Sequence, residues 1–287
     1  MSSDAVRLFE TRRAEQIAAR RRQTALFGVV FLAAFAVSVV VGEVSLERLA
    51  TGLPRFFAYI ERTLPTLSLA TLGADLGRWF WNFEGWLRLL FDTILIAFVA
   101  TTLGVIGGFL LSFAAAKNLV ANPWIHHGAR RFLELMRTVP ELVFALFFVF
   151  AFGLGPMAGV LAIALHTLGV LGKLFAEINE NVTAKSLDGV VAAGASFDQV
   201  IRFGVVPQVL PGFVSYTLLR FEINVRSASV IGFVGAGGIG QELMFVINQF
   251  IYTDISAILL MLIVTVALID LGCEKLRHRL IGQESLK

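Results

Sequence analysis

Residues 188–211 read DGVVAAGASFDQVIRFGVVPQVLP. This stretch lies between two long apolar segments but is not itself one of them. Its pattern predicts a small helix up to Ala193, a break at Gly194, and a second short amphipathic helix over 196–203. A helix–turn–helix between two membrane spans serves no purpose within the bilayer. We therefore expect the stretch to contact a partner on the water side.

Local capping signals support the second of these short helices. Ser196 is of the type that caps a helix, and Gln199 follows three residues later, in the capping-box position. Proline interrupts a helix because it lacks the backbone N–H and fixes φ. Pro207 and Pro211 are therefore expected to stop the second helix before the chain enters the next apolar run.

The composition is that of a polytopic, all-α membrane protein. Of the 287 residues, 57% are hydrophobic and 16% are charged, and the mean hydropathy is +0.78. The charges cluster between long uncharged runs, so the net charge of +3 is ascribed to arginines that flank and orient membrane spans. Nucleic acid is accordingly not an expected partner, and membrane lipid is. The single Cys273 can form no internal disulfide.

The apolar runs predict about six crossings of a hydrocarbon core ~30 Å thick, which needs about 20 residues per helix. They cover 24–41, 87–116, 132–152, 157–175, 212–231 and 255–273. A cleaved signal peptide is the alternative for the first run, but its polar leader is long and no small-x-small site follows it. The first run is therefore expected to be retained as a transmembrane helix.

Residues 43–85 differ from the spans in composition. Leu53, Phe56, Phe57 and Ile60 are spaced for one face of a helix, which predicts a segment along the membrane surface. The tryptophans that follow are of the interfacial kind and favour anchoring at the membrane edge; they are Trp79, Trp81 and Trp86.

The distribution of Lys and Arg predicts the orientation. With six crossings, both tails, the 117–131 loop and the 177–211 stretch lie on one side, and that side carries the basic tails and several arginines. On the opposite side, the segments 153–156 and 232–254 contain no Lys or Arg, and in 43–85 acidic residues offset the arginines. The positive-inside rule therefore predicts that both termini and the 188–211 stretch are cytoplasmic.

Charges within the apolar runs indicate a second important region. Arg220, Glu222 and Arg226 lie in the fifth run, where each charge costs roughly 2.5–3.5 kcal/mol on insertion scales and must face protein or water. Glu222 and Arg226 are four residues apart and favourably ordered for a pair, whereas Arg220 points elsewhere and Glu141 is an available partner. Two interpretations stay open: structural ion pairs between helices, or a polar path for an anionic solute. Since the fifth run holds one more arginine than glutamate, the second interpretation favours an anionic solute over a cationic one.

Motifs for enzymatic chemistry are missing from the sequence. It contains no Walker A, H-E-x-x-H or G-x-S-x-G pattern and no metal-spaced Cys/His cluster. Residues 235–240 match G-x-G-x-x-G, but they follow a membrane helix rather than a strand, so a dinucleotide site is rejected. His126 and His127 are expected to be a solvated pair in a loop, and His166 a helix-packing histidine.

The stretch 188–211 resembles the cytoplasmic coupling motif of ABC importer permeases, whose pattern is E-A-A, three residues, G, and a final hydrophobic-Leu-Pro. Gly194 falls on the motif glycine and Pro207 on the terminal proline, whereas Asp188 begins a D-G-V that departs from E-A-A. The blocks RTVPELVFA at 137–145, LGPMAGVLAIALHTLGVLGKL at 154–174 and RFEINVRSASVIGFVGAGGIG at 220–240 resemble the phosphonate transporter permease family. The resemblance covers about 85–275.

This resemblance implies a type I, MetI-like importer permease of the bacterial inner membrane. It would work with a second copy of itself, two ATPase subunits and a periplasmic solute-binding protein, and would move phosphonate or a related phosphorus oxyanion. The chain would perform no chemistry and would hold no cofactor or metal, since ATP and Mg²⁺ bind the ATPase. The implied coupling residues are Asp188, Ala193, Gly194, Ala195, Ser196, Phe197 and Pro207. The residues expected in the translocation path or its ion pairs are Glu141, Arg220, Glu222 and Arg226.

The predicted organisation follows from these assignments. It comprises a cytoplasmic tail 1–23, a first transmembrane helix 24–42, a periplasmic or interfacial segment 43–85, a permease core 86–275 with the coupling helix–turn–helix at 185–210, and a cytoplasmic tail 276–287. Two alternatives belong to other classes. An ion-coupled secondary transporter would usually show inverted repeats, and no clear repeat is present. An integral membrane enzyme would need Glu134, Glu141 or Glu222 to converge with a nucleophile or metal.

Overall fold

The computed structural model describes residues 3–282, and every regular element in that range is a helix. Residues 1–2 and 283–287, the outer ends of the two predicted tails, lie outside the described residues. The chain divides into two compact units, Met1–Arg62 and Thr63–Lys287. Each unit is therefore described separately.

The first unit consists of helix α1 (Ser3–Val41) and most of α2 (Leu46–Thr63). The sequence predicts a polar tail followed by a membrane helix from residue 24, but α1 is one continuous helix through both parts. Residues 12–22 are almost entirely Ala, Arg, Glu and Gln, which are strong helix formers, so the helix extends through them. The apolar part of α1 is long enough to span a membrane.

Helix α2 carries the apolar residues predicted to share one helical face. Leu53, Phe56 and Phe57 lie on it with exposed side chains. The helix contains Pro54, and Glu47 lies in its first turn, where a negative charge is favourable. The predicted position of this helix along a membrane surface stays a prediction.

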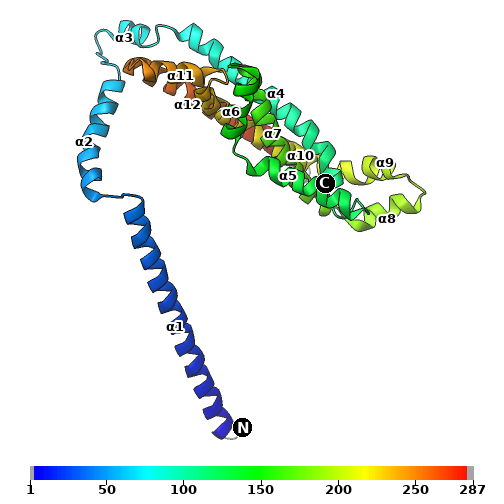
Figure 1. Cartoon of the computed structure of the whole chain (residues 1–287). Coiled ribbons are helices and arrows are strands. Elements are labelled where there is room, and N and C mark those ends of the chain that lie inside the picture. Colours follow the sequence, from blue (N-terminus) through cyan, green and yellow to red (C-terminus); the bar gives the residue numbers. More distant parts are fainter. Residues whose placement is uncertain (1–2, 283–287) are drawn as a thin grey trace. The chain divides into compact units, whose positions relative to one another are not determined.

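The second unit is a helical bundle (Figure 1). Its elements are α3 (Leu72–Trp79), α4 (Phe83–Ala115), α5 (Pro123–Thr138), α6 (Glu141–Phe152), α7 (Pro156–Glu180), α8 (Ala184–Ala192), α9 (Phe197–Gln199), the π-helix η1 (Val200–Val205), α10 (Val206–Ile231), the 3₁₀ turn η2 (Gly232–Val234), α11 (Ile239–Asn248) and α12 (Tyr252–Gly282). The tail predicted from residue 276 starts inside α12.

Helices α4 and α7 form the most extensive contact in the bundle. Small residues make this close approach possible: a Cβ added at Gly108 would lie 2.9 Å from the backbone nitrogen of Gly172. At Gly104, a Cβ would collide with the side chain of Thr167. The glycines of α4 therefore allow α7 to approach closely.

The third apolar run is not a straight span. Helices α5 and α6 are bent by 86° at Val139 and Pro140, so the pair is a broken span or a re-entrant loop. Pro140 cannot donate a backbone hydrogen bond, and the residue before a proline is pushed out of the helical region. Val139 accordingly has ψ 123°, and the helix ends there.

The prediction of a polar loop over 117–131 is wrong from residue 123 onward, because α5 begins at Pro123. Asn122 caps this helix by accepting the Trp124 N–H at 2.9 Å, and Pro123 occupies its first turn. His126 and His127 therefore lie on a helix, and His126 is 9% exposed rather than solvated.

The glycine-rich segment after α10 forms a tight turn that packs back on the bundle. Gly235, Gly237 and Gly238 all have positive φ, which glycine adopts at little cost. A Cβ at Gly240 would lie 1.8 Å from the carbonyl oxygen of Ser229 on α10. The residues of the G-x-G-x-x-G pattern thus allow a close backbone approach to α10.

Candidate functional site

The first candidate site is a helical hairpin formed by α8, α9 and η1, which projects at one end of the bundle (Figure 1). Helix α8 ends at Ala192, and Gly194 turns the chain with φ +83° while its N–H donates to the Val191 carbonyl at 2.9 Å. The Ser196 N–H then donates to Gln199 Oε1 at 2.9 Å as α9 begins. The predicted break at Gly194 and this hydrogen bond of the predicted capping box are confirmed.

The hairpin has an apolar inner side and an exposed tip. Leu187 and Ile201 pack against a buried apolar cluster that includes Phe175 of α7 and Val205. The predicted coupling residues lie mostly outside this contact: Asp188, Ala193, Gly194, Ser196, Phe197 and Pro207 are exposed, and Ala195 is half-buried. The arrangement therefore anchors the hairpin to the bundle and leaves its tip free for a partner.

The second helix of the hairpin does not stop at the prolines, and that expectation is wrong. It passes through η1, where the Val206 N–H bonds to the Ile201 carbonyl, and continues as α10. Pro207 lies in the first turn of α10, where a missing N–H is tolerated, and Pro211 lies inside the helix. The π-helix shifts the hydrogen-bond register immediately before Pro207. The hairpin tip and the fifth span are consequently parts of one continuous helical segment.

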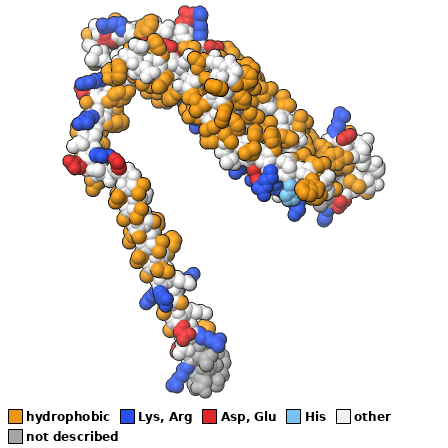
Figure 2. All heavy atoms as spheres, in the orientation of Figure 1, with side chains coloured by type: hydrophobic (Ala, Val, Ile, Leu, Met, Phe, Trp, Pro, Cys, Tyr) orange, Lys and Arg blue, Asp and Glu red, His pale blue; other side chains and the backbone are white. Residues whose placement is uncertain are grey.

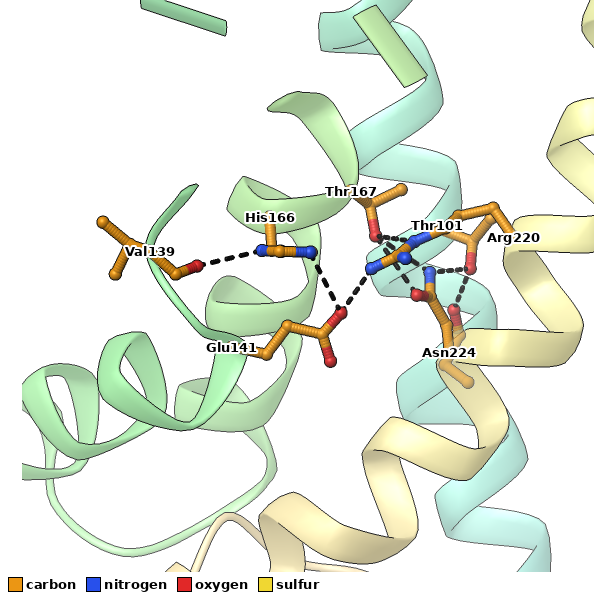
Figure 3. A network of polar contacts seen from close by, with 8 residues as sticks. Thr101, Val139, Glu141, His166, Thr167, Arg220 and Asn224 are labelled. Atoms are coloured by element: carbon orange, nitrogen blue, oxygen red, sulfur yellow. Dashed lines mark hydrogen bonds and ion pairs between the residues drawn. The ribbon is translucent and has the colours of Figure 1, made fainter. Parts of the chain in front are cut away.

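The second candidate site is a buried polar network between four helices (Figure 3). Arg220 of α10, which is 8% exposed, forms an ion pair with Glu141 at the start of α6. Its Nε also donates to the Thr167 hydroxyl of α7 at 3.3 Å. Asn224 donates from Nδ2 to the hydroxyls of Thr167 at 3.0 Å and of Thr101 of α4 at 2.8 Å. The network thus joins α4, α6, α7 and α10.

His166 connects this network to the break between α5 and α6. Its Nδ1 lies 3.0 Å from the Val139 carbonyl, and its Nε2 lies 3.7 Å from Glu141 Oε1. A carbonyl oxygen only accepts, so Nδ1 carries the proton in this contact. The histidine satisfies the carbonyl released where the helix bends, which agrees with the packing role expected of it.

The second intramembrane pair is also present, but the inferred surplus of arginine is not. Arg226 contacts Glu222 Oε1 at 2.6 Å, as the spacing predicts, with 48% of the Arg226 side chain exposed. Arg220 is neutralised by Glu141 and Arg226 by Glu222, so these four residues carry no excess positive charge. These residues therefore give no support for an anionic solute by their charge.

Sequence reasoning missed three uncharged members of the network: Thr101, Thr167 and Asn224. Threonine hydroxyls are common in membrane helices because they can bond to their own backbone, so Thr101 and Thr167 gave no signal. Asn224 could have been found, since it follows Arg220 by four residues and faces the same way on a helix.

Comparison with known proteins agrees with this architecture. The sequence model of the family described as "Binding-protein-dependent transport system inner membrane component" matches residues 108–273. The chain belongs to this family. The match includes the hairpin and every member of the polar network except Thr101, and it confirms the predicted resemblance to ABC importer permeases. Because the family consists of transport components, the alternatives of a membrane enzyme and of an ion-coupled transporter are not favoured.

Individual relatives and solved structures resemble the chain over most of its length. The phosphite transport system permease protein PtxC of Stutzerimonas stutzeri is 38% identical over 85% of this chain and 83% of its own. The phosphate-import permease protein PhnE of Mycolicibacterium smegmatis is 37% identical over 67% of this chain, which is 36% of that relative. An inward facing MetNI methionine ABC transporter has a TM-score of 0.60 at 18% identity, covering 68% of this chain and 95% of the transporter chain. The fold class predicted from the sequence is thereby confirmed.

Proposed function

We propose that this family member is the permease subunit of an ATP-driven ABC importer that moves phosphonate or a related phosphorus oxyanion across the inner membrane. The observation that carries the proposal is the 38% identity to a phosphite transport permease, which extends over 85% of the chain. A second relative, 37% identical, imports phosphate by its name. Phosphite, phosphate and phosphonates share a tetrahedral phosphorus with several negatively charged oxygens.

The working assembly would contain two copies of this chain, two ATPase subunits and a periplasmic solute-binding protein. ATP and Mg²⁺ would bind the ATPases. Both termini and the α8–α9 hairpin would be cytoplasmic, since the hairpin end carries Lys117, Arg130, Arg131 and Lys185. The turns at the other end, 153–156 and 232–251, contain no Lys or Arg.

In this assembly the hairpin tip would transmit motion of the ATPase to the bundle. The exposed Phe197 begins a continuous helical segment that leads through η1 into α10. Arg220 lies 14 residues after Val206, which is about 21 Å along a helix. A displacement of the tip is thereby carried along one helix to the network that contacts α4, α6 and α7.

The network itself would brace the path between the helices. Its charges are balanced, its members are buried or nearly buried, and each of them bonds to a residue of another helix. Such a set holds one packing arrangement strongly and must break before α6 and α10 separate. We therefore assign Glu141 and Arg220 to the control of the path, and Glu222 and Arg226 to a more exposed pair beside it.

The proposal is tested by ATPase activity in nanodiscs, with the chain assembled with its ATPase and binding protein. The binding protein is supplied empty, or loaded with phosphite, methylphosphonate, phosphate or sulfate. Stimulation by a phosphorus oxyanion but not by sulfate is expected. A complex that assembles but responds to none of the phosphorus oxyanions would overturn the substrate class while leaving the permease assignment intact.

A further inference from the structure

A basic cavity lies at the hairpin end of the bundle, apart from both candidate sites described above. It has a volume of about 350 Å³ and is lined by Lys117, His126, His127, Arg130, Arg131 and Glu134. It lies where the chain leaves α4 and α5 begins. In Figure 2, Lys, Arg and His side chains gather over this end of the bundle.

The charges around the cavity leave an excess of positive charge. Glu134 contacts Arg131 at 2.6 Å and Lys173 at 3.5 Å. Glu180 contacts Arg130 at 3.2 Å and accepts the backbone N–H of Lys117 at 2.9 Å. Two carboxylates therefore offset the side chains of four cationic residues, those at positions 117, 130, 131 and 173. The remaining charge favours an anion of one or two negative charges.

Two histidines also line the cavity, and one of them is largely buried. His126 lines the cavity at 9% exposure, and among the described residues its Nδ1 is one of few buried side-chain polar atoms without a hydrogen-bond partner. This nitrogen is itself inaccessible to solvent, so any contact with a ligand in the cavity falls to the rest of the His126 ring. The neighbouring His127 ring places Nδ1 2.7 Å from the Pro123 carbonyl, which leaves its Nε2 for another contact. Two imidazoles and two guanidinium groups provide several donors for a tetrahedral oxyanion.

The other side of α5 is apolar and places the cavity at a membrane interface. Trp124 is 85% exposed, and Ile125, Phe132 and Leu135 are also exposed on the same helix. Tryptophan next to basic residues is typical of the headgroup level of a bilayer. A molecule with a phosphate group in the cavity would therefore lie beside a surface suited to acyl chains.

We propose that this cavity binds the phosphate group of an anionic ligand, held by Arg130, Arg131, Lys117 and the His126 ring. The shared chemistry is that of a phosphorus oxyanion, and its source is either an anionic phospholipid headgroup or free inorganic phosphate. The site goes beyond the proposed transport function, since none of its residues belongs to the network or to the hairpin tip.

The test uses the full chain, purified in detergent, and native mass spectrometry with phosphatidylglycerol, phosphatidylcholine or inorganic phosphate. Removing a cation near the headgroup costs about fivefold in affinity, so the double variant Lys117→Gln/Arg131→Gln should bind the anion about 25-fold more weakly. Arg88→Gln is the matched control, because Arg88 and Arg131 are 77% and 79% exposed and each contacts one glutamate on its own helix.

Each outcome decides the proposal. Phosphatidylglycerol binding that is lost in the double variant and kept in the control assigns the site to a lipid headgroup. Binding of inorganic phosphate that is lost in the double variant and kept in the control, with no preference for phosphatidylglycerol over phosphatidylcholine, assigns the site to the free anion. His126→Gln should weaken the binding of either ligand further. Lys117 and Arg131 are both exposed, so the double variant is expected to fold as the wild type does. Equal binding by the double variant and the control, or no binding of either probe, would overturn the proposal.

Discussion

The pair formed by Glu141 and Arg220 allows a quantitative prediction. Changing Glu141→Leu leaves the guanidinium of Arg220, which is 8% exposed, without its carboxylate. Removing one partner of a buried ion pair costs about 3–5 kcal/mol, because the remaining charge is uncompensated. The Thr167 hydroxyl at 3.3 Å is a neutral acceptor and replaces little of that loss. We expect the free energy of unfolding to fall by at least ~3 kcal/mol.

The double variant Glu141→Leu/Arg220→Met should recover most of this loss. With both charges removed, no buried charge stays uncompensated, and apolar side chains of similar size are often neutral or stabilising at such positions. Its stability should lie within about 1–2 kcal/mol of wild type, which corresponds to a coupling energy of at least about 4 kcal/mol between the two sites when each single variant costs about 3 kcal/mol. Arg220→Met alone should resemble Glu141→Leu.

The assay is reversible unfolding in mixed micelles, followed by fluorescence of the four tryptophans. Arg226→Gln is the control, because the Arg226 side chain is 48% exposed and its pair with Glu222 should contribute less than about 1 kcal/mol. If each single variant costs less than about 1 kcal/mol, or if the double variant costs the sum of the two, the charges are independent and the bracing role is refuted.

Three further predictions concern the hairpin, the glycine turn and a small helix. Gly194→Val places a branched side chain at φ +83° and should uncouple ATP hydrolysis from uptake while the protein stays inserted, as shown by the ratio of ATPase to transport rates. Gly240→Ala drives a methyl group into the Ser229 carbonyl and should lower the free energy of unfolding by about 2 kcal/mol, as overpacking of a core does, in the unfolding assay. The Thr71 hydroxyl holds the pKa of Asp75 below its usual range. The stabilisation of α3 by the ionised Asp75 carboxylate is therefore fully present above the unfolded pKa of about 3.9, and it is lost as the pH falls through the lower folded pKa of Asp75. Hydrogen exchange of α3 would detect this loss.

Matched controls make these three results interpretable. Gly189→Ala lies in α8 with open space around it and should leave coupling intact. Gly77→Ala, likewise in open space on α3, should be neutral or slightly stabilising. Asp75→Asn should remove the acid transition of α3. Normal transport by Gly194→Val would show that the turn is not the coupling element, and wild-type stability of Gly240→Ala would contradict the close approach of the turn to α10.

Local signals account for the parts of the fold that the sequence predicted well. The apolar runs locate the spans because about 20 residues are needed to cross the bilayer. Gly194 and Gln199 mark the hairpin through a left-handed turn and a cap, both of which act within a few residues. Glu222 and Arg226 meet because residues four apart share a helix face.

Errors arose where a local signal was overlooked or was overridden by packing. Asn122 and Pro123 are a local signal for a helix start, although they lie in the stretch predicted to be the 117–131 loop. The sequence predicts that Pro207 ends the second short helix, but the π-helix before it shifts the backbone hydrogen-bond register and the helix continues. The arginine surplus was a count of residues, and a count says nothing of which carboxylate lies next to which guanidinium.

The sequence by itself determined that this chain is an all-helical membrane protein with an exposed hairpin, because hydrophobic length, capping and turn chemistry are properties of short segments. Only the tertiary structure decided that Thr101, Glu141, Thr167, Arg220 and Asn224 form one network, since they come from four helices up to 123 residues apart. Side-chain polar groups buried in a membrane protein bond to whichever partner packing brings within about 3 Å. That choice depends on how helices cross, which no single segment encodes.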